Sequence, residues 1–248
     1  MLLMRQIYRI KSMAEQTPTN SMISENLNYC LGFLAICFLG VMPVASTQEL
    51  NVRLLEKQPP SELSEAIKSK LDTAVVEVRE GDTLLYEFWF PSVTQLEPKQ
   101  AKDSSVLDQL PVACLIGAAK IHRDKRDYRD DDLYSGVHTI RFALQPQDGN
   151  HLGSSEYPYF GLLVMAENDR SLDGIKTYKQ LTKASSLDTA SEHPIILSLR
   201  PAISEAEKYT LVEPAPDHEA IRIEINANDG DDAKVVKFDL VVKGHGHL

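Results

Sequence analysis

The segment AIRIEINANDGDDAKVVKFDLVVK, residues 220–243, decides the fold. Apolar and polar residues alternate in both of its halves, which is the two-residue period of a half-buried strand. The turn-forming residues Asn228-Asp229-Gly230-Asp231 separate the halves. The segment therefore predicts a hairpin that buries one face, made of Ile221, Ile223, Ile225, Val236, Phe238, Leu240 and Val242.

Strand patterns recur through the rest of the chain beyond Thr47. A second hairpin is expected where Val75–Arg79 and Thr83–Phe90 flank Glu80-Gly81-Asp82. Further apolar or alternating runs are Val112–Ile121, Val137–Gln145, Phe160–Ala166 and Ile195–Leu199. Because these strands do not alternate with long helices, the sequence predicts an all-β fold, an antiparallel β-sandwich with a jelly-roll-like arrangement.

One or two short helices are expected among the strands. Ser61–Leu71 follows two prolines, and Ser61 is a suitable N-cap for a helix with one apolar face. A second helical spacing relates Ile175, Tyr178, Leu181 and Ser185. The Pro-rich stretch 213–216 is the expected boundary of the final hairpin, if the chain has a second part.

The N-terminal segment 1–46 is predicted to be a signal peptide. Residues 31–42, LGFLAICFLGVM, match the length of a signal-peptide apolar region and fall short of a membrane span. Cleavage before Thr47 would leave residues 47–248 as one β-sandwich domain in the periplasm, outside the cell or at its surface. The alternative is a retained membrane anchor, in which case the membrane is contacted only through this segment. Cleavage would also leave Cys114 without a disulfide partner.

The charge balance restricts the partners. The chain carries 26 Lys and Arg against 36 Asp and Glu, a net charge of −10. A nucleic-acid-binding surface would be basic, so nucleic acid is not an expected partner. A protein or carbohydrate ligand is compatible with this charge, and the sequence does not name either.

Sequence motifs for catalysis are missing. There is no H-E-x-x-H or C-x-x-C ligand pair, no G-x-S-x-G nucleophile motif and no Gly-rich phosphate loop in the expected domain. The first hypothesis is therefore an exported, non-catalytic module that binds a ligand or has a structural role, without a cofactor. The sequence does not decide whether the protein is an enzyme, and it favours a protein without catalytic activity.

A second hypothesis is a metal-dependent site, hydrolytic in its strongest form. Asp148 and His151 lie three residues apart in a turn-forming stretch, QPQDGNHLG, residues 145–153. His193 precedes a strand and would join them only if the fold brings those strand ends together. Carboxylate and imidazole ligands of this kind suit a divalent cation, namely Zn²⁺, Cu²⁺ or Ca²⁺.

A third hypothesis is a carbohydrate-binding module that uses the aromatic rings of Trp89, Tyr157 and Tyr159 as stacking surfaces. The charged stretch 122–132 mixes acidic and basic residues, so it is expected to be a solvated loop with local ion pairs rather than a Ca²⁺ site. His138 shares a strand face with Ile140 and Phe142 and is expected to be a buried, hydrogen-bonded histidine.

Leu133–Gly153 resembles a group of uncharacterised exported bacterial proteins. Their shared core is G-V-Y-T-L-R-Y-x-L-Q-P-x-D-G-D/N-H-x-G, and His138 and Asn150 stand here in place of the usual aromatic and acidic residues. Segments 160–164 and 192–199 are similar to later parts of the group. The resemblance implies export and a β architecture but no activity, and it includes the polar positions Asp148, His151 and His193.

Overall fold

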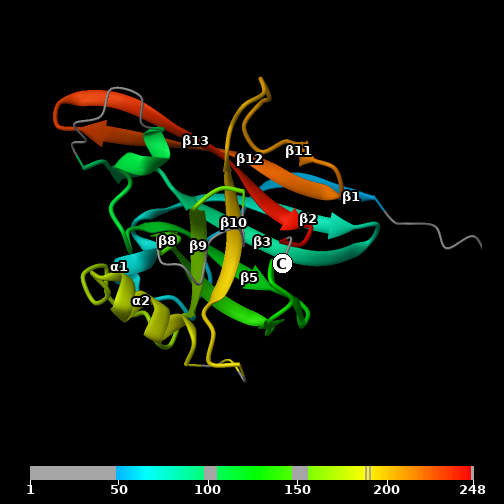
Figure 1. The fold of residues 1–248 in the computed structure, drawn as a ribbon, viewed down its shortest axis with the longest axis horizontal. Coiled ribbons are helices and arrows are strands. Elements are labelled where there is room, and N and C mark those ends of the chain that lie inside the picture. The colour runs from blue at the N-terminus through cyan, green and yellow to red at the C-terminus, as the bar shows by residue number, and fades with distance from the viewer. Residues whose placement is uncertain (1–48, 98–104, 147–155, 188, 190, 247–248) are drawn as a thin grey trace, which may run out of the picture. The chain divides into compact units, whose positions relative to one another are not determined.

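Antiparallel strands dominate the structure, a computed structural model that describes residues 49–97, 105–146, 156–187, 189 and 191–246 (Figure 1). These residues belong to one compact unit, Ser46–Leu248. The expected signal peptide, its cleavage point, Asp148 and His151 lie outside the described residues.

One large sheet contains nearly all the strands. Neighbours along it are antiparallel, in the order β1 (Leu50–Glu56), β2 (Leu71–Glu80), β3 (Thr83–Pro91), β5 (Leu115–Ile121), β8 (Gly136–Leu144), β9 (Tyr159–Met165), β10 (Ile195–Pro201), β13 (Asp232–Lys243), β12 (His218–Asp229) and β11 (Leu211–Ala215). A short strand directly after β3, β4 (Val93–Gln95), pairs in parallel with β12. The sheet thus curls so far that the segment directly after β3 reaches β12, near the other end of the strand order.

The mainly β, antiparallel class is confirmed, whereas a sandwich of two sheets or a jelly roll is not. The described strands form this curled sheet and a separate two-stranded ribbon, β6 (Lys125–Arg126) with β7 (Asp132–Leu133). In the charged stretch 122–132 the expected local ion pairs are present, Arg126 with Asp132 and Arg129 with Asp131, but the stretch also forms most of this ribbon and buries Asp127.

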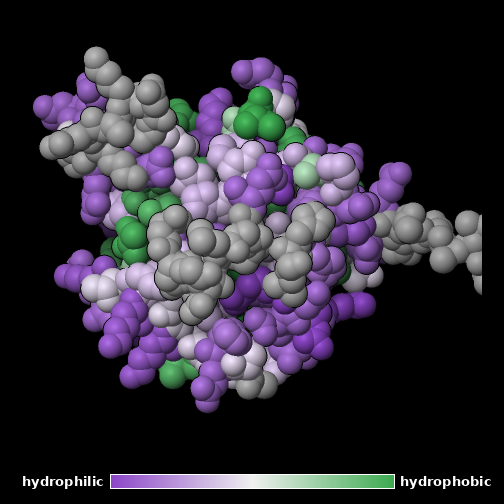
Figure 2. Space-filling model, viewed as in Figure 1, coloured by the Kyte–Doolittle hydropathy of each residue, from purple (hydrophilic) through white to green (hydrophobic). Residues whose placement is uncertain are grey.

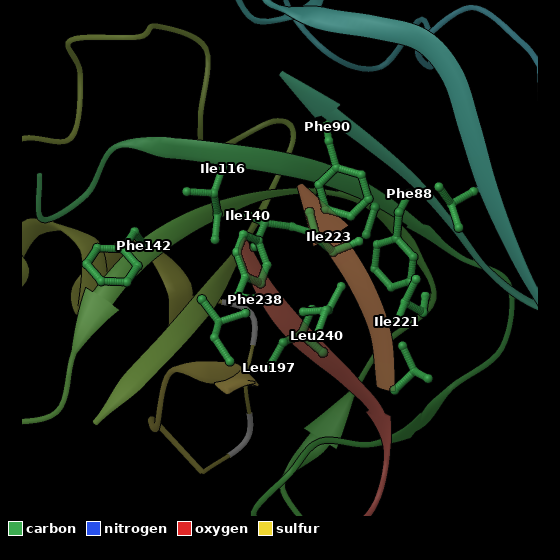
Figure 3. Packing of buried hydrophobic residues seen from close by; sticks show 14 of the residues in the cluster. Phe88, Phe90, Ile116, Ile140, Phe142, Leu197, Ile221, Ile223, Phe238 and Leu240 are labelled. Atoms are coloured by element: carbon green, nitrogen blue, oxygen red, sulfur yellow. The ribbon is translucent and has the colours of Figure 1, made fainter. Parts of the chain in front are cut away.

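The C-terminal hairpin forms as predicted. Ile221 pairs with Leu240, and Ile223 pairs with Phe238 across β12 and β13, and the turn uses Gly230 at φ 61°. Their side chains join the inner-face core, where they pack with aromatic and aliphatic residues from β3, β5, β8 and β10 (Figure 3). Fully burying a side chain of this size stabilises a fold by about 1.5–3 kcal/mol, so the hairpin anchors the core.

Two helices cover the outer face of the sheet (Figure 1). The first, α1 (Glu65–Lys68), is a single turn capped by Ser64 rather than Ser61, shorter than expected because Leu71 already begins β2. The second, α2 (Tyr178–Ser185), begins with a capping box from Thr177 and Gln180 and confirms the helical spacing. A short 3₁₀ helix, η1 (Val106–Gln109), precedes β5.

The Pro-rich stretch 213–216 does not separate two parts. Residues 213–215 belong to β11, which pairs with β12 at the edge of the sheet. A proline lacks a backbone donor, and an edge strand tolerates it because one side of the strand has no neighbour.

A buried ion pair ties three segments together beneath the outer face. The guanidinium of Arg141 on β8 lies 2.6 and 2.9 Å from the two carboxylate oxygens of Asp169, and both residues are 1% exposed. Thr139 also donates to Asp169, while Arg141 donates to the carbonyl groups of Ala113 and Ser171. The pair therefore holds the segment before β5 and the segment between β9 and α2 against β8.

Asp169→Asn should lower the free energy of unfolding by about 3–5 kcal/mol, because it leaves the buried Arg141 guanidinium without a balancing charge. Urea denaturation followed by circular dichroism measures this change. The matched control is Asp173→Asn, which removes an exposed carboxylate 3.6 Å from Lys176 and should change stability little. Equal losses in the two variants would contradict the importance of the buried pair.

His138 is buried as expected, but it is not hydrogen-bonded. Its residue is 1% exposed, and neither ring nitrogen has a hydrogen-bond partner. Burial lowers the pKa of His138 to about 4, because the interior disfavours the charged imidazolium. The neutral form is therefore favoured in the folded protein.

Acid should consequently destabilise the protein through His138. Its folded pKa lies below the unfolded value of about 6.5, so the unfolded chain binds the proton first. The contribution of neutral His138 to the free energy of unfolding is complete above about pH 6.5. It falls by on the order of 3 kcal/mol as the pH drops to about 4. His138→Phe should remove this part of the pH dependence in urea titrations at a series of pH values. His193→Gln, a change at an exposed histidine, should keep the wild-type dependence; a wild-type slope in both variants would refute the assignment.

Candidate functional site

A hollow of about 130 Å³ lies on the outer face beside α2, and we call it the α2 hollow. Its floor is apolar and comes from three neighbouring strands. Ala143 and Phe160 are paired across β8 and β9, and Leu162 and Ile196 are paired across β9 and β10. The sheet register thus places four apolar side chains on one patch of the outer face.

Helix α2 forms one wall of the α2 hollow. The buried Leu181 packs against the outer-face cluster, and the Ser185 hydroxyl accepts a 3.0 Å hydrogen bond from the Ile195 backbone at the start of β10. These contacts fix the helix over the sheet. Tyr178 and Thr182, on its remaining side, line the hollow.

Asp127, between β6 and β7, positions the turn that carries Arg129, a residue that lines the α2 hollow. Its carboxylate accepts backbone hydrogen bonds from Arg129, Asp131 and Ile196 at 2.8–3.0 Å, and the residue is only 4% exposed. Burial raises the pKa of Asp127, and these hydrogen bonds oppose that rise. The carboxylate therefore folds the stretch into a turn and docks it on β10.

Arg129 is the cationic group of the α2 hollow. One terminal nitrogen, Nη2, donates a 2.6 Å hydrogen bond to the Pro194 carbonyl and lies 3.5 Å from Asp131. The Nε atom is buried without a hydrogen-bond partner. No hydrogen bond from Nη1 occurs within the described part of the chain. The guanidinium is thus positioned by the backbone while part of its donor capacity is unused.

The sequence reasoning missed Arg129 and Asp127. Three aspartates and three arginines in residues 123–130 made the stretch look like a solvated loop. The available local signal was the spacing of Asp127 before Arg129 and Asp131, since an aspartate often accepts from backbone groups two residues on. The partner that buries Asp127 is Ile196, which is distant in the sequence.

His193 is the one predicted metal ligand among the described residues. It is exposed and lines the α2 hollow together with Gln145 and Pro146, the residues that lead into Asp148. The end of β8 and the start of β10 therefore meet at one hollow, which is the condition that the metal hypothesis required. Within residues 49–97, 105–146, 156–187, 189 and 191–246, no group of three His, Cys, Asp or Glu side chains could hold a metal. The site at Asp148, His151 and His193 stays a prediction.

Two of the three aromatic rings named for carbohydrate binding are buried, and the third is half-buried. Trp89 is fully buried and donates to the Lys57 carbonyl, and Tyr159 is 7% exposed. Tyr157 is half-buried, with the Arg200 guanidinium 5.4 Å from its ring centre. Hydrophilic residues predominate among the coloured atoms of Figure 2, where apolar residues form only small areas.

No protein-family model matches the sequence, and comparisons with curated proteins and with solved structures find no match. The resemblance to exported bacterial proteins therefore stays a prediction. In the described ranges, no helix is both long and apolar enough to cross a bilayer.

Proposed function

We propose that the protein is an exported, non-catalytic binding module whose α2 hollow takes a compact ligand with an apolar body and one anionic group. The observation that carries this proposal is the fixed Arg129 guanidinium beside the apolar floor. A cavity of about 150 Å³ accepts a benzene-sized molecule, so a hollow of about 130 Å³ suits one ring or a short branched chain.

We infer the anionic group of the ligand from the unused hydrogen-bond donors of Arg129. A carboxylate accepts charge-assisted hydrogen bonds from a guanidinium, often through two nitrogens. Asp131 competes weakly, since its carboxylate lies 3.5 Å from Nη2 and is partly exposed. The net charge of −10 disfavours a highly charged ligand, so a monoanion fits best.

A binding role agrees with the side chains around the α2 hollow. The Thr182 hydroxyl donates to the carbonyl groups of Tyr178 and Lys179 in its own helix. Its hydrogen is thus directed to its own helix backbone, whereas a catalytic nucleophile directs its hydrogen to a general base. The thiol of Cys114 is also unsuited to attack, because burial raises its pKa to about 12.

Benzoate is a suitable probe of this proposal. We expect saturable shifts of the backbone resonances of Ala143, Leu162 and Thr182 in ¹H–¹⁵N NMR titrations. Arg129→Gln should weaken benzoate binding at least about tenfold, because one charge-assisted hydrogen bond contributes about 1.5–3 kcal/mol. Neutral benzamide should bind the two proteins equally.

The control is Arg123→Gln, which removes an exposed arginine outside the hollow and should leave benzoate binding unchanged. Because Arg129 also holds the Pro194 carbonyl, a second variant is useful. Thr182→Trp places a large ring at the hollow and should abolish binding with Arg129 intact. Absence of saturable shifts in the wild type, or unchanged binding in both hollow variants, would reject the proposal.

Export is the other half of the proposal, and residues 31–47 support it. An apolar segment of this length followed by small residues is typical of a signal peptide. Expression of the full chain in a bacterial host should yield a periplasmic protein that begins at Thr47, as read by N-terminal sequencing. Ser46→Gln is the comparison and should slow cleavage, because signal peptidase accepts only small side chains at Val44 and Ser46, three residues and one residue before the cleavage point. Recovery of the intact Met1 end from the wild type would refute cleavage.

A further inference from the structure

A second hollow, of about 190 Å³, lies between the β6–β7 ribbon, the inner-face core and the residues after β13. We call it the ribbon hollow. Its apolar lining includes Leu133 and Leu197. The chain after β13 is tied beside it, since the Gly246 backbone donates 2.8 Å to the Tyr128 carbonyl.

Lys125 supplies an unpaired positive charge to the ribbon hollow. Its backbone is fixed by pairing with Leu133 across the ribbon, and its side chain is half-buried. No acidic side chain lies within ion-pair distance of its ammonium among the described residues. The ammonium instead lies 4.6 Å from the ring centre of Tyr86. Burial lowers the pKa of Lys125, the charge of Glu80 opposes that shift, and the charge of Lys243 adds to it.

Tyr86 supplies a second polar group without a partner. The residue is 3% exposed and lines the ribbon hollow, and its hydroxyl makes no hydrogen bond within the described part of the chain. Burial, and secondarily the charge of Asp127, raises the pKa of Tyr86, so its hydroxyl keeps its proton. It is therefore available as a hydrogen-bond donor.

The spacing of these two donors suits one oxyanion. An ammonium over the face of a tyrosine ring lies roughly 5–6 Å from the hydroxyl oxygen of that ring. Each donor reaches an acceptor at about 2.8 Å. A carboxylate or phosphate group between them could therefore accept from both, which would satisfy the Tyr86 hydroxyl and balance the Lys125 charge.

The other charged groups around the ribbon hollow already have partners. Arg126 lies 3.0 Å from Asp132, Lys243 lies 3.5 Å from Glu219, and His245 lies 3.1 Å from Asp130. Asp127 is surrounded by the three backbone donors described above. The Glu80 carboxylate acts on Lys125 only from beyond ion-pair distance, so the Lys125 ammonium has no direct carboxylate partner among the described residues.

We propose that the ribbon hollow is a binding site for a small oxyanion, a carboxylate or phosphate group joined to a short apolar chain, held by Lys125 and Tyr86. The apolar chain would lie against Leu133 and Leu197. This site is separate from the α2 hollow and does not depend on the function proposed for it.

NMR titrations with sodium butyrate and with inorganic phosphate, each at constant ionic strength, test the proposal. We expect saturable shifts at Lys125, Tyr128 and Gly244. Lys125→Gln should weaken binding at least about tenfold, and Tyr86→Phe, which removes only the hydroxyl, should weaken it about three- to tenfold. Saturation by butyrate alone identifies a carboxylate site with an apolar chain, and saturation by phosphate alone identifies a phosphate site.

The matched control is Lys237→Gln, which removes an exposed lysine on β13 outside the ribbon hollow and should not change binding. Since Lys125 makes no direct ion pair within the described ranges and Glu80 acts on it only from a longer distance, Lys125→Gln should keep the thermal unfolding midpoint close to that of the wild type, so weaker binding is not a loss of folding. No saturable shift with either anion, or equal binding by wild type and Lys125→Gln, would overturn the proposal.

Discussion

The buried pair of Arg141 and Asp169 is the interaction on which the outer face of the sheet depends. Asp169 lies between β9 and α2, so the position from which the chain enters α2 is set by its two hydrogen bonds to the Arg141 guanidinium. Arg141 also reaches the Ala113 carbonyl, ahead of β5. The two side chains of so deeply buried a pair must stay in contact, because each one alone would be an uncompensated charge in the interior. The ion pair therefore helps to place α2 where it forms one wall of the α2 hollow.

The pair also explains why Thr139 and Arg141 occupy alternate positions on β8. Thr139 and Arg141 are two residues apart on β8, so both side chains point to the outer face, and both contact Asp169. His138 points to the opposite face, among the apolar residues of the interior. Thr139 and Arg141 therefore have a structural role on the outer face of β8.

The sequence was sufficient wherever the deciding interactions are local. The hairpin of β12 and β13 needs only alternation and a turn, and α2 needs only a helical spacing and a cap, so both were predictable. The curl of the sheet was not, because it depends on three residues of β4 pairing with a strand far along the chain. The same holds for β11, where Pro214 suggested a boundary and the empty side of an edge strand accepts it.

The candidate sites also divide into features that local sequence predicts and features that depend on distant contacts. A histidine before a strand drew attention to His193, and the fold does bring it to one hollow with Pro146. Arg129 was hidden because its role depends on Asp127, whose burial comes from a contact with Ile196. Charge composition alone cannot distinguish a solvated aspartate from one that organises a turn. The backbone donors around it make that distinction, and they become visible only in the folded chain.

The proposed sites place cations in a chain whose net charge is −10, and this combination has a physical consequence. Long-range repulsion opposes the approach of any anion, but charges farther apart than about 8 Å are largely screened at physiological salt. Affinity would then rest on contacts within each hollow, where Arg129 and Lys125 retain unused hydrogen-bond donors. Repulsion grows with ligand charge, whereas each hollow offers one such cation. The acidic surface would therefore select against polyanions, including nucleic acid, while a compact monoanion could still reach the donors that the fold leaves unpaired.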